Sequence, residues 1–253
     1  MKTLNTYIAE AFKINKNTKL QQYKYFPKTR EELKNIINKR IEDEGNECDL
    51  NDIDVSEITD MSKLFYYVQK FNGDISKWNV GNVTDMNWMF YYSKFNGDIS
   101  NWDVSKVVDM HFMFRKSKFT GENTDLSGWD VSNVKDMEEM FSQTKFNGDL
   151  SKWNVGKVID MSYMFFENSE FNGDLSKWNV SSVTNMRGLF KKSKFNGDIS
   201  KWNVGKVIDM HEMFFGSSFK KDISEWDVSK VTDAFGIFNS CPIKEEYKPK
   251  FNK

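Results

Sequence analysis

The chain of 253 residues is poor in several residue types, and each shortage excludes a class of protein. Its 2 cysteines, Cys48 and Cys241, cannot form the disulfide framework on which small secreted domains depend. No apolar run approaches the ~18 residues of a membrane-spanning helix. The 36 Lys and Arg are balanced by 37 Asp and Glu, and a net charge of -1 argues against a general nucleic-acid-binding protein, which is normally strongly basic.

The N-terminus also lacks the apolar run that is typical of an export signal. Asn5 and Glu10 interrupt the segment that follows Lys2, whereas a signal peptide needs about 7–15 consecutive apolar residues. The sequence therefore predicts a protein that stays in the compartment where it is made, which is a cytoplasmic location.

The sequence is instead rich in aromatic residues, which are arranged in a repeat. Tryptophans recur at spacings of 24 to 27 residues, at positions 78, 102, 129, 153, 178, 202 and 226. Ile53 takes the equivalent position 25 residues before Trp78, which gives eight units. A fixed period of this length is typical of a solenoid, in which each unit packs only against its neighbours.

A single unit is too small to fold alone. It offers about eight large apolar side chains, whose burial contributes about 12–24 kcal/mol in total. Ordering ~24 residues costs at least as much, at about 1–2 kcal/mol per backbone residue. Stacked units overcome this limit because each apolar side chain then contacts its copy in the next unit.

Two local patterns predict the secondary structure of a unit. Segment 99–104 matches the L-x-x-L-x-L pattern of leucine-rich repeats, which predicts a short parallel strand around each Trp-x-Val. The apolar residues of 83–90 follow at i, i+3, i+6 and i+7, which predicts a short helix that Asp85 caps. The expected fold class is α/β: a leucine-rich-repeat-like right-handed solenoid of about eight coils, each with a short parallel strand and a short helix.

The two ends differ from the repeats. Thr29 and Glu32 form a capping box, the apolar residues of 33–41 follow at helical spacing, and Gly45 ends the pattern. This arrangement predicts an α-helical N-terminal cap on the first coil. The predicted organisation is a helical cap with a basic segment at 1–49, an eight-unit repeat array at 50–240 and a C-terminal tail at 241–253.

The motif Phe-Asn-Gly-Asp closes most units. Its Asn-Gly pair tolerates positive φ, which predicts a tight left-handed turn. Its aspartates could bind calcium or close their own turn; calcium sites gather about 6–8 oxygens, and one such acid per turn favours the turn-closing role. The aspartates at this position, or at its equivalent, are Asp74, Asp98, Asp125, Asp149, Asp174, Asp198 and Asp222.

The repeats resemble a known family. Units that read Trp-Asn-Val-Gly-Asn-Val-Thr-Asp-Met-Asn-Trp-Met-Phe at 78–90 and Phe-Asn-Gly-Asp-Ile-Ser at 95–100 resemble BspA-type leucine-rich repeats, which are also described from mycoplasma surface lipoproteins. The resemblance covers about residues 50–240. It implies a role in adhesion or protein binding, with the cell surface as an alternative location. The first twelve residues are also similar to openings of proteins from phages of gut Bacteroidetes, which implies a virion-associated location as a further alternative.

The residue patterns of catalysis are missing from the sequence. It contains no phosphate-binding loop, no zinc-ligand spacing and no nucleophile–base pair. His111 and His211 occupy the same unit position four coils apart, about 19 Å at ~4.8 Å per coil, so they cannot share a metal ion. We therefore expect a protein that is not an enzyme and that has no cofactor, no metal site and no small-molecule substrate.

Aromatic side chains at variable positions, in and just after the predicted short helices, form the candidate binding patch. Exposed aromatic rings supply binding energy at low entropic cost. The alternative is that these rings pack between neighbouring coils, and a second candidate surface is the Asn-, Asp- and Lys-rich face beside each tryptophan, which could bind a glycan or an acidic partner. The candidate residues are Tyr66, Tyr67, Trp88, Tyr91, Tyr92, Phe112, Tyr163 and Phe166.

The predicted function is a non-enzymatic protein–protein interaction module that presents a rigid surface to a protein partner. Residues 1–41 carry ten basic and three acidic side chains, a net charge of +7, which could steer an acidic partner. A nucleic-acid partner is not expected. The alternatives are a surface adhesin for host or bacterial proteins or glycans, and an accessory structural protein of a phage or virion.

Overall fold

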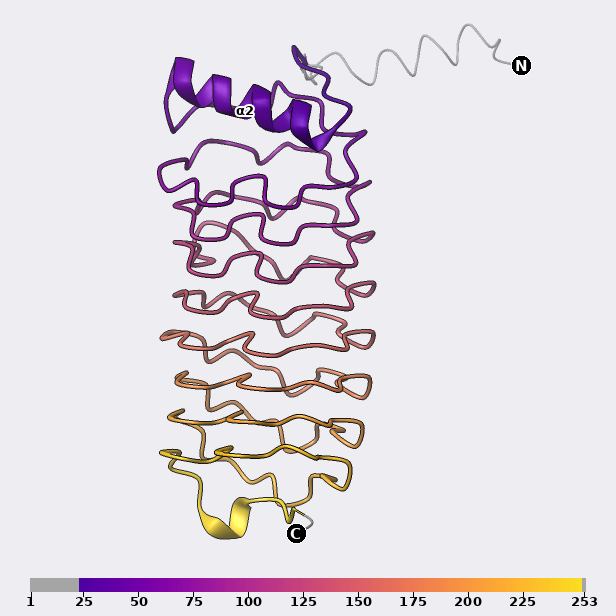
Figure 1. Cartoon of the computed structure of the whole chain (residues 1–253), viewed down its shortest axis with the longest axis vertical. Helices are drawn as coiled ribbons and strands as arrows, with labels where there is room; N and C mark the ends of the chain where they lie inside the picture. The colour runs from indigo at the N-terminus through magenta and orange to yellow at the C-terminus, as the bar shows by residue number, and fades with distance from the viewer. Residues whose placement is uncertain (1–22, 252–253) are drawn as a thin grey trace, which may run out of the picture.

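The computed structural model describes residues 23–251, which form a stack of coils (Figure 1). Helix α2 (Arg30–Glu44) covers the first coil, and the short 3-10 helix η1 (Glu245–Tyr247) lies at the opposite end. Within residues 23–251, neither helix is long and apolar enough to span a bilayer. Much of the basic segment predicted within 1–41 lies outside the described residues.

The predicted α/β solenoid is wrong, because the coils contain neither the strands nor the helices that the sequence pattern predicts. Between α2 and η1 the structure contains no helix, and its β-structure is reduced to isolated parallel bridges. Most of these bridges join the equivalent residue of each coil to that of the next. The bridged residues are, in order, Asp60, Asp85, Asp109, Asp136, Asp160, Asn185, Asp209 and Asp233.

The segment predicted as a helix is a run of β-turns. In the first coil, the amide of Leu64 donates to the carbonyl of Met61, three residues earlier, at 3.3 Å. The next amide, that of Phe65, donates across to the carbonyl of Met89 in the following coil at 2.9 Å. An α-helix instead bonds each amide to the carbonyl four residues earlier in the same segment, so this alternation of bonds within and between coils excludes a helix.

The strand predicted around each Trp-x-Val is also absent, and side-chain hydrogen bonds connect the coils there. The indole N–H of all seven tryptophans of the repeat donates to the carbonyl of an Ile or Leu in the preceding coil. For Trp102 the acceptor is Ile75, at 3.2 Å. The rings of Trp78 and Trp102 stack with their centroids 6.4 Å apart.

Phenylalanines fill the centre of the stack. Phe90 packs against Phe95 of its own coil at 4.5 Å and against Phe114 of the next coil at 5.5 Å. Equivalent rings repeat this arrangement along the molecule, so the core is one continuous column shared by all coils. The largest fully buried side chains are Phe65, Phe71, Phe90, Phe95, Phe114, Phe119, Phe141, Phe146, Phe165, Phe171, Phe190 and Phe195.

The Phe-Asn-Gly-Asp motif is not a left-handed turn, because its glycines do not have positive φ. Glycine is required for another reason: a Cβ at Gly97 would lie 2.9 Å from the ring of Phe95. The side-chain oxygen of Asn72 accepts a hydrogen bond from the amide of Asn96 in the next coil at 2.7 Å. The turn-closing role predicted for the aspartates is confirmed; Asp98, for example, accepts from the backbone amide two residues later at 2.9 Å.

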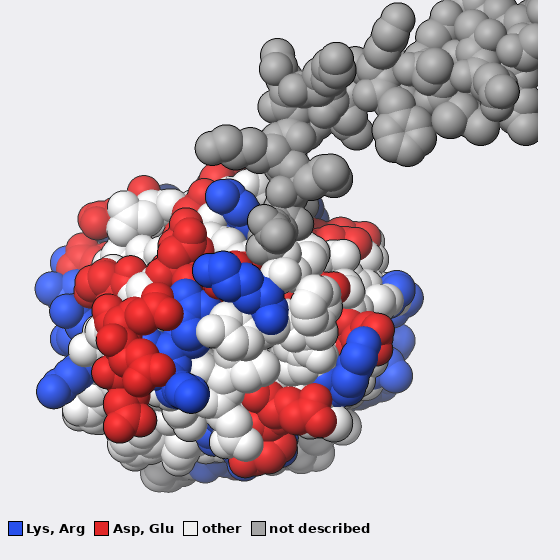
Figure 2. Space-filling view, turned by 90° about the horizontal axis from the view of Figure 1, so that it is seen from above, with Lys and Arg blue, Asp and Glu red and all other residues white. Residues whose placement is uncertain are grey.

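Helix α2 closes the N-terminal end of the stack, as the capping box predicts. The Thr29 side chain accepts a hydrogen bond from the amide of Glu32 at 3.2 Å, and Leu33 and Ile37 are buried. The buried Arg40 donates to the Asp52 carboxylate in the first coil at 2.7 Å. Figure 2 looks down on this end, where acidic and basic side chains lie side by side around an uncharged centre.

Candidate functional site

Each coil presents its β-turn segment on one side of the stack, and we call the outward side chains of these segments the turn face. In the first seven six-residue segments the third and fourth side chains are buried in the core, while in the last segment Phe238 is only partly buried. Most of the other side chains of each segment form the turn face. The segments are 62–67, 87–92, 111–116, 138–143, 162–167, 187–192, 211–216 and 235–240.

Two positions of every segment, the second and the sixth, have a left-handed backbone. Glycine suits this conformation, and glycine occupies it at Gly188, Gly216 and Gly236. Trp88 and Phe112 occupy the same position with φ of 57° and 58°. A left-handed conformation costs a residue with a side chain about 1–2 kcal/mol. Most of these positions carry a side chain all the same, and those of Trp88 and Phe112 are among the largest.

Six of the eight predicted site residues form one continuous group on the first three segments, which we call the aromatic cluster. The rings of Trp88 and Phe112 stack with centroids 4.2 Å apart. Tyr66 stacks on Tyr91 at 5.2 Å. The cluster consists of Tyr66, Tyr67, Trp88, Tyr91, Tyr92 and Phe112.

The members of the aromatic cluster differ in exposure. Tyr67 is 50% exposed, Tyr92 42% and Tyr66 38%, whereas Tyr91 is only 7% exposed. For Tyr91, therefore, the alternative of packing between coils describes the structure. The three exposed tyrosines are available to a partner, and Tyr91 supports them from below.

The remaining two predicted residues, Tyr163 and Phe166, form a separate pair. Their ring centroids are 5.7 Å apart, and segment 138–143 lies between them and the aromatic cluster. Arg187 of the next coil donates to the Tyr163 hydroxyl at 3.0 Å. Lys191 lies 5.7 Å from the centre of the Phe166 ring. Both rings of this pair therefore contact a basic side chain of the next coil.

Cationic side chains around the aromatic cluster were missed in the sequence. Arg115 lies 5.7 Å from the ring centre of Tyr91 and 5.2 Å from that of Phe112. A groove of about 570 Å³ borders the cluster at Tyr92. Its basic lining residues are Lys94, Lys116 and Lys118. Aligning the sequence on the repeat period would have found Arg115 and Lys116, since they occupy the fifth and sixth positions of their segment.

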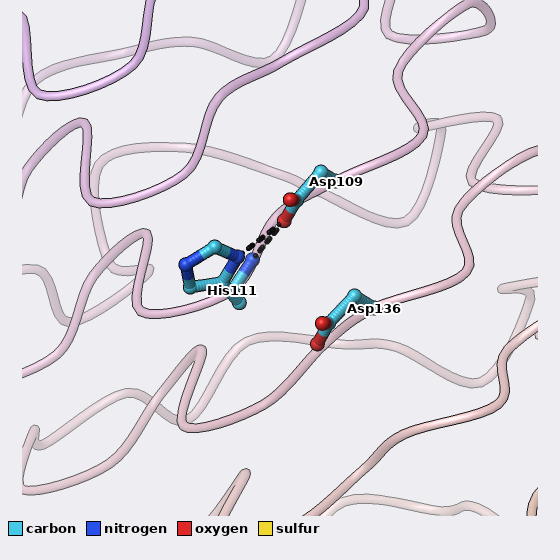
Figure 3. Close-up of side chains that lie close together, drawn as sticks. All are labelled: Asp109, His111 and Asp136. Atoms are coloured by element: carbon cyan, nitrogen blue, oxygen red, sulfur yellow. Dashed lines mark hydrogen bonds and ion pairs between the residues drawn. The ribbon is translucent and has the colours of Figure 1, made fainter.

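Histidine and acidic side chains continue the turn face next to the aromatic cluster. The Trp88 indole N–H donates to Nε2 of His111 at 2.8 Å, and Nδ1 of His111 lies 2.7 Å from Oδ1 of Asp109. The metal-binding atoms of Asp109, His111 and Asp136 all lie within 4.8 Å of one another (Figure 3). These are the side chains of the described region that could hold a metal ion.

Burial and mutual repulsion perturb the acids of this region. Burial, together with the neighbouring charges of Asp160 and Asp136, raises the pKa of Glu138 to about 7. Burial is also the main cause that raises the pKa of Asp136 above its usual value. The carboxylates therefore repel one another at neutral pH, and the region favours the arrival of a proton or another cation.

The family of the chain follows from its repeats. A model of the family described as "Mycoplasma protein of unknown function, DUF285" matches residues 31–145, 117–217 and 190–248. The chain belongs to this family. Membership agrees with the mycoplasma-type repeats that the sequence resembles, while the BspA-type assignment stays a prediction. No curated protein and no solved structure matches the chain.

Proposed function

We propose that this chain is a non-enzymatic interaction module that binds a protein partner through the aromatic cluster. The observation that carries the proposal is that four of the thirteen side chains held at left-handed positions, those of Tyr67, Trp88, Tyr92 and Phe112, are aromatic rings gathered on three neighbouring segments. Strained residues of this kind are typical of functional sites. Membership in a repeat family of unknown function is compatible with the proposal.

The backbone beneath the aromatic cluster is rigid, which favours binding. The amide of Tyr67 donates to the carbonyl of Tyr91 at 2.9 Å, and the amide of Tyr92 donates to the carbonyl of Arg115 at 2.8 Å. The backbones of Tyr67 and Tyr92 are therefore held by the next coil before a partner arrives. A pre-organised aromatic side chain loses little entropy on binding, so most of its contact energy becomes affinity.

The charges around the cluster indicate the chemistry of the partner. Lys63 lies 6.0 Å from the Trp88 ring centre, and the groove beside Tyr92 adds three lysines. Arg115 is already paired with Glu139. The surface therefore suits a protein segment that carries apolar side chains flanked by acidic ones.

The proposal is tested by capture of a partner with matched variants of the full chain. In the first variant Tyr67→Ser and Tyr92→Ser remove two exposed rings at sixth positions of their segments. In the control, Glu167→Ser and Lys192→Ser change the same positions in later coils. We expect the wild type and the control to capture the same protein from an extract of the source organism, and the tyrosine variant to lose it with unchanged circular dichroism. Equal capture by all three proteins would contradict the proposal.

The two other functions predicted from the sequence stay predictions. A surface adhesin would retain binding to intact cells or to glycans, and this binding would also depend on the tyrosine pair if the same surface is used. A virion accessory protein would co-purify with phage particles. The same two variants, assayed on cells and on particles, separate these functions from binding to a soluble protein.

A further inference from the structure

Two acidic side chains from neighbouring coils lie beside one histidine on the turn face. A parallel bridge pairs Asp109 with Asp136, so the two carboxylates lie in adjacent coils although they are 27 residues apart in the chain. His111 reaches back to Asp109, and its Nδ1 is the ring nitrogen on the side of both carboxylates (Figure 3). The three side chains therefore converge on one small volume.

No lysine or arginine of the described residues compensates the charges of these carboxylates, and His111, whose Nδ1 lies 2.7 Å from Asp109, is the partner that the protein offers. The bridged residues from Asp60 to Asp233 form a column along the turn face. At its first member, Asp60, Arg30 forms an ion pair at 3.1 Å. In the part of the chain that the structure describes, no lysine or arginine forms an ion pair with Asp85, Asp109, Asp136 or Asp160. The middle of the column is thus a region of negative charge with His111 as its one partner able to carry positive charge.

A second histidine lies in the same arrangement of two aspartates, and there an arginine of the protein supplies the positive charge. His211 occupies the same position four coils later, between Asp209 and Asp233. There the guanidinium of Arg187 lies 3.4 Å from Asp209 and 3.7 Å from Asp233. The residue equivalent to Arg187 in the first arrangement is Asn87, which has no charge.

From this contrast we propose that Asp109, His111 and Asp136 bind one divalent transition-metal ion, of which Zn²⁺ is the best fit. The ion would take the place that Arg187 fills in the second arrangement. One imidazole nitrogen and two carboxylate oxygens are a ligand set that suits Zn²⁺. Calcium would need about 6–8 oxygen ligands, which this set does not provide.

The site is open enough for water to complete the coordination shell. The side chains of His111 and Asp109 are 23% and 32% exposed. The ligand atoms lie within 4.8 Å of one another and would have to approach further, because Zn²⁺ bonds of about 2.0–2.1 Å allow at most about 4.2 Å between two ligands. The turn hydrogen bond from the His111 amide to Asp109 at 3.0 Å holds one of the ligands in place.

Metal binding also changes the contact between His111 and the aromatic cluster. A neutral His111 with these contacts carries its proton on Nδ1, which donates to Asp109, and its Nε2 accepts from the Trp88 indole. When Nδ1 binds the ion, that proton leaves the nitrogen and the neutral ring carries its proton on Nε2 instead. Two N–H groups then face each other, so the hydrogen bond from Trp88 is lost.

The experiment is a calorimetric titration of the EDTA-treated full chain with Zn²⁺. The test variant is Asp136→Asn, which keeps the turn because Asn185 holds the equivalent position in this chain and accepts the same hydrogen bond at 3.0 Å. The matched control is His211→Gln. We expect one site in the wild type and in the control, with an affinity reduced about tenfold or more in Asp136→Asn, and no heat of binding with Ca²⁺.

Two further measurements identify the ligands. The indole N–H resonance of Trp88, assigned with Trp88→Phe, should shift on addition of Zn²⁺. Co²⁺ should give no thiolate charge-transfer band, which excludes Cys48 and Cys241 as the ligands. The proposal is overturned if the wild type does not bind Zn²⁺, if Asp136→Asn binds as tightly as the wild type, if His211→Gln loses the site, if the Trp88 resonance stays unchanged, or if the thiolate band appears.

Discussion

Replacing Glu138 with glutamine should make the protein more stable at alkaline pH and leave it unchanged in acid. Burial and the charges of Asp160 and Asp136 raise the pKa of Glu138 from 4.5 to about 7 in the folded chain. A raised folded-state pKa means that folding favours the protonated acid. The stability that this proton contributes is fully present below pH ~4.5 and is lost as the pH rises through about 7.

The size of the effect follows from the shift. A difference of about 2.5 pKa units corresponds to about 3 kcal/mol at ~1.36 kcal/mol per unit. Glu138 is only partly buried, so solvent screening reduces this to an expected gain of about 1–2 kcal/mol in the free energy of unfolding for Glu138→Gln at pH 8. At pH 5 the folded wild type carries a neutral Glu138 and only its unfolded state is partly ionised, so the gain should fall to a small fraction of that at pH 8.

The assay is urea unfolding at pH 5 and pH 8, followed by circular dichroism in the presence of EDTA. Burial lowers the pKa of His111, but Asp109, Asp136 and Glu138 together raise it above its usual value, so Glu138→Gln also brings the pKa of His111 down. Glu167→Gln is the matched control. Hydrogen bonds from Gln143 and Lys192 lower the pKa of Glu167, so its replacement should slightly destabilise the protein at pH 8. A Glu138→Gln protein that is no more stable than the wild type at pH 8, or that is equally stabilised at pH 5, would refute the electrostatic explanation.

Three further substitutions test the packing of the coils by the change in the free energy of unfolding. Trp153→Phe keeps an aromatic ring but leaves the buried carbonyl of Leu126 in the preceding coil without its indole donor, and should cost about 1–3 kcal/mol. No measurable loss would show that the indole hydrogen bond is dispensable. Gly97→Ala should cost about 1–3 kcal/mol because its Cβ meets the Phe95 ring. In the control Gly128→Ala the new Cβ has nothing within 4 Å, so the free energy of unfolding should stay within ~0.5 kcal/mol of the wild type. Equal effects of the two substitutions would contradict the steric explanation. Lys116→Gly should stabilise the chain by up to about 1 kcal/mol, because φ is 57° there, and a loss of stability would argue against strain at the left-handed positions.

The proposed metal site and the aromatic cluster lie next to each other, but their tests change different residues. The proposed partner binding depends on the exposed Tyr67 and Tyr92, whereas the proposed metal binding depends on Asp136. The two meet where Trp88 donates to His111. A chain that binds Zn²⁺ normally after loss of both tyrosines would place the two activities on separate residues of one surface.

Much of the candidate site could be predicted from the sequence because the repeat defines which residues are neighbours. Tyr66, Trp88 and Phe112 come from three successive units, and their rings lie together in the structure. The burial of Tyr91 could not be predicted, because it depends on the rings of Tyr66 and Tyr67, which pack against it from the adjacent coil. Nor could the approach of His111 to Asp136, because it requires the registration of two coils through their backbone bridge.

The sequence alone determined the period, the core and the N-terminal cap. Trp78 and Trp102 stack, Phe90 is buried, and Thr29 caps helix α2. These features follow from local chemistry and from the identity of successive units, both of which are visible in a linear chain.

Only the tertiary structure decided the conformation within a coil. Apolar residues three apart, such as Met86 and Met89, suit a helix and a series of β-turns equally well. The choice depends on the amides of alternate residues, and these find their acceptors one coil away, as Phe65 does at Met89. A hydrogen bond to a residue 24 positions later has no signature in the local pattern, so turns replaced the predicted helices and indole hydrogen bonds replaced the predicted strands.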